Sequence, residues 1–119
     1  MATLIAIKDV DTELGIRTLG GDEALYIDVL GAFCEDIANW RAVIAAYPAT
    51  ASLKSLTTAV HGFKSAARNI GALTAGDLAA AIETAAKADD TAYVDANIAE
   101  LLTMMNDLYE RCSEVSNGG

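Results

Sequence analysis

The chain has 119 residues, of which 53% are hydrophobic and 6% aromatic, and its formal net charge is −9. This length suits one domain that buries a core without disulfide or metal staples, and the acidic balance argues against nucleic acid, whose phosphates bind clustered Lys and Arg. With a single proline and alanine- and leucine-rich segments, the composition predicts an all-α protein.

Four long helices are predicted, preceded by a short helix over residues 11–19. The first long helix spans about residues 22–47, where Asp22 can cap the first turn and Pro48 stops the helix. Its large apolar residues recur at alternating steps of four and three, which is typical of a helix packed in a bundle. They are Tyr26, Leu30, Phe33, Ile37, Trp40, Ile44 and Tyr47.

The second long helix is predicted over residues 52–70, with Gly71 well placed to end it. A third is predicted over 75–88, opened by a capping box of Thr74 and Asp77, with alanine dominating its apolar stripe. The fourth is predicted over 91–115. Because short connections only reach antiparallel neighbours, these helices predict an antiparallel up-and-down four-helix bundle, within one domain over residues 1–119.

Nothing in the sequence resembles a signal peptide or a membrane span. The N-terminus MATLIAIKDVDT has neither a basic leader nor a long apolar run, and no window of about 20 residues lacks charges. We therefore expect a cytoplasmic protein without membrane contact. Cys34 and Cys112 are expected to be small buried core residues and not a disulfide.

The charge is unevenly distributed along the chain. No acidic residue lies between Asp36 and Asp77, so the rest of the chain carries all 17 acidic residues. The window contains four cations, Arg41, Lys54, Lys64 and Arg68. We call this segment the basic zone, and the only histidine of the chain lies in it.

His61 follows the apolar stripe residue Val60 by one position, so we expect it on the flank of the buried face, partly open to solvent. The residues that share its face are Thr57, Lys64, Ser65 and Arg68. An imidazole can attack phosphorus, and Lys or Arg one and two turns on can hold phosphoryl oxygens. On spacing alone, however, an incidental histidine on a solvated face is the more common case. Gly62 beside it costs about 1 kcal/mol relative to alanine.

Other chemistries find no support in the sequence. A di-iron bundle requires Glu-x-x-His pairs, but Thr58 occupies the glutamate position and there is no second histidine. One histidine and two distant cysteines do not make a zinc site, and a Ser-His-Asp triad has no Gly-x-Ser-x-Gly elbow to support it.

From about Asp9 to Val115, the sequence resembles the histidine-containing phosphotransfer (HPt) domains of bacterial two-component phosphorelays. The family motif reads His-x-x-Lys-Gly-Ser/Ala-Ala, followed by an aliphatic residue, Gly and often Ala. The matching residues are His61, Lys64, Ser65, Ala66, Ala67, Ile70, Gly71 and Ala72. A second similar segment comprises Leu19, Gly20, Gly21, Asp22, Leu25, Tyr26, Leu30 and Phe33.

The resemblance implies that His61 accepts a phosphoryl group from a receiver-domain aspartate and donates it to another receiver. The partners are then receiver domains of hybrid sensor kinases and of response regulators. The chain itself would need no cofactor or metal, since Mg²⁺ belongs to the receiver, and would act as a carrier without hydrolytic or kinase activity. We expect a monomer whose docking surface is the exposed apolar rim of the histidine helix, with a contribution from the first long helix.

The resemblance also suggests roles for individual residues. In the family, a Gln or Glu on the next helix hydrogen-bonds the imidazole nitrogen that is not phosphorylated, and the matching residue is Glu83. The alternative for Glu83 is an i,i+4 surface pair with Lys87. Lys64 matches the lysine that helps to stabilise the phosphoryl group, whereas Arg68 matches no fixed role. Ser65 replaces the family glycine. The serine side chain slightly narrows the approach of a partner to His61, and its hydroxyl can hydrogen-bond phosphate.

An alternative function of another class is a helical adaptor that binds receiver domains or other proteins without carrying phosphate. His61 would then be incidental. An adaptor needs neither residue of the His-x-x-Lys pair, so the intact pair favours the carrier.

Overall fold

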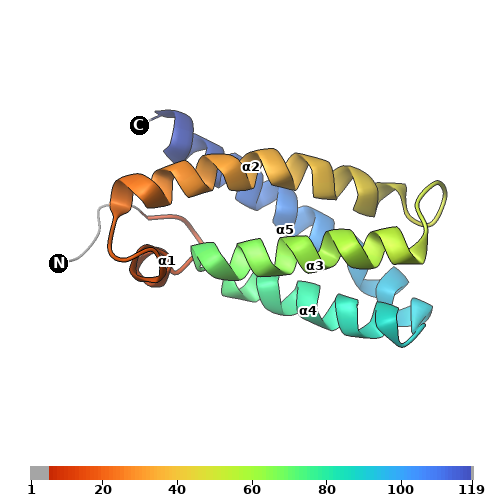
Figure 1. Cartoon of the computed structure of the whole chain (residues 1–119). Helices are drawn as coiled ribbons and strands as arrows, with labels where there is room; N and C mark the ends of the chain where they lie inside the picture. Colours follow the sequence, from red (N-terminus) through yellow and green to blue (C-terminus); the bar gives the residue numbers. More distant parts are fainter. Residues whose placement is uncertain (1–5, 119) are drawn as a thin grey trace.

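The computed structural model describes residues 6–118, which form five helices and no strand (Figure 1). The helices are α1 (Thr12–Thr18), α2 (Glu23–Ala46), α3 (Leu53–Ile70), α4 (Leu73–Lys87) and α5 (Thr91–Gly118). The prediction of an all-α protein is confirmed for this part of the chain. None of these helices is both long and apolar enough to cross a membrane.

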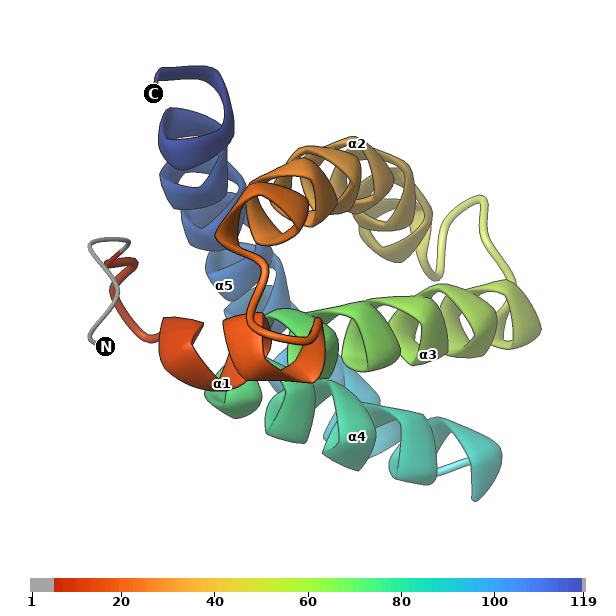
Figure 2. The same cartoon turned by 60° about the vertical axis from the view of Figure 1, so that its left-hand side comes forward.

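The four long helices pack around a common core. Helix α2 contacts α3 and α5, and α4 contacts the same two helices from the other side. The chain reverses direction between α2, α3 and α4, and α5 returns obliquely behind them (Figure 1). Helix α1 lies across one end of this assembly, where it contacts α2 and α3 (Figure 2).

The buried core consists largely of the predicted apolar stripes. In the stripe predicted for the first long helix, Trp40 on α2 and Tyr47 at its C-cap are only half-buried, while the other residues are buried. Cys34 and Cys112 are buried and not bridged, as predicted. Burial raises the pKa of both thiols, that of Cys112 to about 12, so they pack as protonated apolar groups.

The ends of α2 and α3 follow the sequence signals. The Asp22 carboxylate accepts a hydrogen bond from the backbone N–H of Leu25 at 3.0 Å, and Gly71 ends α3 in the left-handed conformation with φ of 94°. Helix α2 is one residue shorter than predicted at each end, and α3 begins one residue later than predicted.

The predicted capping box for α4 is wrong. Helix α4 begins at Leu73, two residues earlier than expected, after Ala72 and without a side-chain cap. The backbone N–H of Ala72 donates to Ala67 at 2.8 Å, so the chain turns from the end of α3 directly into α4. Asp77 is therefore free of the capping role and pairs with Arg68 instead. Helix α5 continues three residues past its predicted end, to Gly118.

The C-terminal end of α3 is held by contacts from α1 and α2. Carbonyls at a helix end lack intrahelical partners, and here the Tyr26 hydroxyl donates to the Ile70 carbonyl at 2.7 Å. The Asp11 backbone N–H donates to the Gly71 carbonyl at 2.8 Å. A Cβ on Gly15 would lie 2.5 Å from the Ile70 carbonyl oxygen, so α1 packs too closely for a larger residue. The hydrogen bond from Tyr26 to Ile70 links the two segments in which the family resemblance resides.

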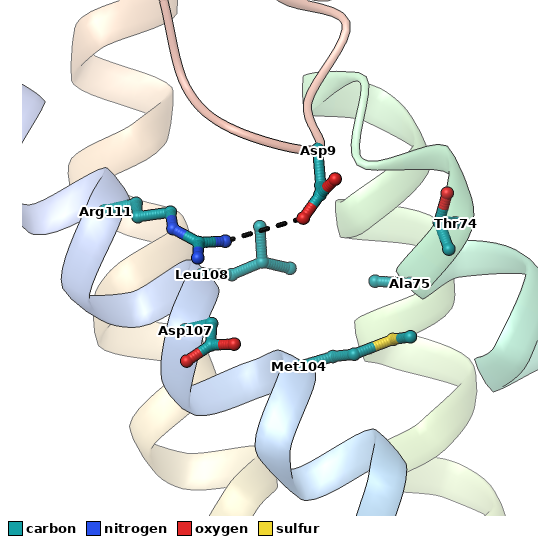
Figure 3. A pocket seen from close by; sticks show the side chains of 7 residues that line it. All are labelled: Asp9, Thr74, Ala75, Met104, Asp107, Leu108 and Arg111. Carbon is teal, nitrogen blue, oxygen red and sulfur yellow. Dashed lines mark ion pairs between the residues drawn. The ribbon is translucent and has the colours of Figure 1, made fainter.

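A pocket lies where the N-terminal segment meets α4 and α5 (Figure 3). Arg111 and Asp9 form an ion pair at 3.7 Å across its rim. Its lining residues are Asp9, Thr74, Ala75, Met104, Asp107, Leu108 and Arg111. The ion pair ties the N-terminal segment to α5, and none of the lining residues belongs to the histidine helix.

We predict that Gly71→Ala destabilises the fold much more than Gly20→Ala. Both glycines have a positive φ, but a Cβ on Gly20 meets nothing, whereas a Cβ on Gly71 collides with the Asp11 carbonyl. Gly20→Ala thus reports the cost of left-handed backbone alone, about 1 kcal/mol. Gly71→Ala is expected to lower the free energy of unfolding by about 3 kcal/mol, because the collision adds to that cost. Urea unfolding measures both, and equal losses would contradict the tight packing of α1 on α3.

Candidate functional site

Glu83 is the one charged side chain that is buried in the part of the chain the structure describes. It lies on α4, and only 6% of its side chain is exposed. A buried carboxylate is costly unless hydrogen-bond donors surround it. Its surroundings therefore identify the residues that the fold brings together around it.

Three side chains donate to the Glu83 carboxylate. The Nδ1 atom of His61 lies 2.6 Å from Oε2, and the Nζ atom of Lys64 lies 2.5 Å from Oε1. Lys87, one turn further along α4, places its Nζ 3.2 Å from Oε2. Both roles considered for Glu83, the imidazole partner and the i,i+4 partner of Lys87, are thus present as contacts.

The ionisation of Glu83 determines the tautomer of the histidine. Burial by itself raises the pKa of Glu83, but the hydrogen bonds from Lys64, His61 and Lys87 outweigh it and lower that pKa to about 2. The carboxylate therefore has no proton to donate at neutral pH. In the neutral ring of His61, Nδ1 must carry the proton, and Nε2 keeps its lone pair.

The imidazole of His61 is accessible, as its position beside Val60 predicts. Its side chain is 58% exposed, whereas Val60 is fully buried. Since the hydrogen bond to Glu83 occupies Nδ1, the nitrogen available to an approaching group is Nε2. The contact with Glu83 fixes the orientation of the ring, so the arrangement is suited to nucleophilic attack by Nε2.

Gly62 owes its place in the helix to Trp40. A Cβ at position 62 would lie 2.8 Å from the Trp40 Nε1 atom, so the glycine lets the indole ring of α2 lie against α3. The same indole packs edge-on against Phe63 with ring centroids 6.3 Å apart. Sequence periodicity assigned Trp40 to the core and missed its contact beside His61, although a glycine inside a helix was the available signal.

A hollow on the surface adjoins this contact. It is formed between α2 and α3, and its lining residues are Trp40, Val43, Lys54, Ser55, Thr58 and Ala59. Thr58 precedes His61 by three residues on the same helix, so the hollow and the histidine share one side of α3. We call it the α2–α3 hollow.

Comparison with known proteins identifies the family. The family model of the Hpt domain matches residues 28–111, which is more than half of the chain. The chain belongs to the Hpt domain family. The matched range contains α3 and α4 and therefore His61, Lys64 and Glu83. No curated protein and no solved structure matches the chain.

The cations of the basic zone have different partners in this Hpt domain. Arg41 donates to Asn106 on α5 at 2.6 Å, and Arg68 pairs with Asp77 on α4 at 3.3 Å. Gly76 makes room for the Arg68 side chain, whose Cγ would lie 2.8 Å from a Cβ there. Of the two predicted site cations, Lys64 therefore binds Glu83 beside His61, whereas Arg68 binds Asp77 and lies outside this cluster.

Two further features of the Hpt domain bear on its chemistry. Ser65 is exposed on α3, next to Lys64 in sequence and one turn from His61. Among residues 6–118, no group of three or more His, Cys, Asp and Glu side chains is arranged to hold a metal ion.

We predict that Glu83 gives this Hpt domain an acid-sensitive stability. A carboxyl whose pKa falls from its ordinary 4.5 to about 2 on folding stabilises the fold above pH 4.5, and that contribution is lost as pH falls towards 2. Between pH 5 and pH 2, the wild type should lose about 2 kcal/mol more unfolding free energy than Glu83→Gln. Urea unfolding followed by Trp40 fluorescence measures it. Glu110→Gln, on the exposed side of α5, controls for one charge fewer, and parallel profiles for the wild type and Glu83→Gln would contradict the prediction.

Proposed function

We propose that this Hpt domain is a carrier in a two-component phosphorelay. His61 accepts a phosphoryl group at Nε2 from the aspartyl phosphate of one receiver domain and passes it to the aspartate of another. The observation that carries the proposal is the 2.6 Å contact between His61 Nδ1 and the ionised Glu83 carboxylate. It leaves an exposed ring with one free, nucleophilic nitrogen.

The chemical step follows from the tautomer. Nε2 attacks the phosphorus, a P–N bond forms, and the P–O bond to the receiver aspartate breaks with its electron pair returning to the carboxylate. The Nδ1 proton stays on the ring, and the positive charge that the ring gains faces the negative charge of Glu83. Donation to the second receiver reverses these changes. In phosphoryl transfer the protein contributes mainly position and charge, and Mg²⁺ is supplied by the receiver.

The neighbouring residues take supporting roles in this proposal. Lys64 stabilises the phosphoryl group by its charge while its Nζ is held on Glu83. The exposed Ser65 hydroxyl offers a hydrogen bond to a phosphoryl oxygen, and its small size leaves room for the receiver. Arg68 is 45% exposed, but its pair with Asp77 offsets its charge, so we assign it no direct part in the transfer.

The docking surface that we propose combines the basic zone with the α2–α3 hollow. Its apolar floor contains Trp40 and Val43, and Lys54 lies at the same hollow. An acidic receiver site is attracted to the basic zone, whereas the remainder of the chain, which holds all the acidic residues, repels it. We further propose that the chain works as one domain, an antiparallel up-and-down four-helix bundle, as a monomer in the bacterial cytoplasm.

We predict that His61→Gln abolishes phosphoryl transfer. The protein is incubated with a phosphorylated receiver domain and Mg²⁺ and examined for acid-labile, alkali-stable label, which is typical of phosphohistidine. The wild type should be labelled and His61→Gln should not, although both bind the receiver. Equal labelling would exclude the carrier function, and binding without labelling of either protein would favour the adaptor.

We predict that Lys64→Ala slows transfer from the receiver by about tenfold, equivalent to 1.4 kcal/mol of transition-state stabilisation. The variant removes a charge from the cluster and one hydrogen bond from Glu83, but Lys87 and His61 still hold the carboxylate. Lys8→Ala is the matched control, since it removes an exposed lysine that lies outside both the Glu83 cluster and the proposed docking surface. A rate for Lys64→Ala equal to that of the control would remove its electrostatic role.

A further inference from the structure

The two lysines on Glu83 are held unequally. Lys64 donates to Oε1 at 2.5 Å, and only 20% of its side chain is exposed. Lys87 lies 3.2 Å from Oε2, the oxygen that also accepts from His61, and 65% of its side chain is exposed. Lys87 is also the last residue of α4, and its side chain reaches back one turn to Glu83. Its contact is thus the weaker and the more solvated of the two.

Phosphorylation changes the charge balance of this cluster. Before transfer, one carboxylate faces two ammonium groups, so the cluster has one positive charge in excess. A phosphoryl group on Nε2 brings up to two negative charges to a position one imidazole ring away from Glu83. A cation is then more stable at the phosphoryl oxygens than as the second ammonium on one carboxylate. One lysine must nevertheless stay, because a buried carboxylate without donors is costly.

We propose that Lys87 is a switching cation that leaves Glu83 for the phosphoryl oxygens when His61 is phosphorylated. Lys64 stays on Oε1 and keeps the carboxylate against the imidazole. The inference rests on the proposed function for its biological setting, but its chemistry concerns the phosphorylated histidine alone. It assigns to a residue outside the His-x-x-Lys motif the task of stabilising the phosphorylated state.

The experiment uses phosphoramidate, which phosphorylates exposed histidines without a receiver. Nε2 of His61 attacks the phosphorus, the P–N bond of the reagent breaks, and ammonia leaves. The pH midpoint at which the phosphoryl group gains its second negative charge is then measured by ³¹P NMR. Because a nearby cation favours the dianion, Lys87→Met should raise this midpoint by about one pH unit. Lys87→Arg, which keeps the charge, should stay close to the wild type.

Controls separate this role from the alternatives. Lys54→Met removes a cation of the basic zone that is not on Glu83, and its midpoint should equal that of the wild type. In the unphosphorylated protein, ¹⁵N NMR of the imidazole should show the proton on Nδ1 in Lys87→Met as in the wild type, because Lys64 still holds Glu83. A changed tautomer would mean that Lys87 positions Glu83, which would overturn the proposal.

Two other outcomes would also overturn it, namely an unchanged midpoint in Lys87→Met and a failure of phosphoramidate to label His61. If phosphoramidate labels His61 and Lys87→Met shifts the midpoint, the inference stands even where a phosphorylated receiver transfers nothing. That last result would reject the carrier function alone, so the failures of the two proposals are distinguishable.

Discussion

The site depends on one buried carboxylate. Glu83 projects from α4 toward α3 with 6% of its side chain exposed, and it is stable there because three donors neutralise and bind it. Its ionised state in turn assigns the proton of His61 to Nδ1 and leaves Nε2 as the nucleophile. One electrostatic constraint thus connects the packing of two helices to the chemistry of the ring.

The helix that carries the histidine is anchored at its end and open along its side. Tyr26 and Asp11 bond the last carbonyls of α3, and α1 packs against that end. Along the side, Gly62 lets the Trp40 indole lie close to the helix axis, so the ring packs against α3 without covering His61. A nucleophile needs both conditions, since transfer requires a fixed orientation and room for a partner.

The positive charge around His61 does not come from the basic zone alone. Three of the four cations in the basic zone bind residues of other helices: Lys64 binds Glu83, whereas Arg41 and Arg68 bind residues outside the Glu83 cluster. The cluster around Glu83 also contains Lys87, which lies outside the basic zone and binds the same carboxylate as Lys64. The net charge that a partner meets is therefore set by which cations the bundle leaves exposed.

The spacing of apolar residues in the sequence determined the helices, most of the core and the exposure of the histidine. Apolar residues at steps of three and four define which side of a helix is buried. Only the tertiary structure decided which residues meet across helices. The start of α4 was missed because its turn is made by backbone contacts with the end of α3 and not by a side-chain cap. Arg68 lies on the same face of α3 as His61, but it pairs with Asp77 on α4. The Lys87 partner of Glu83 lies four residues away and can be found in the sequence, whereas His61 and Lys64 lie 22 and 19 residues away and meet it only because α3 packs on α4.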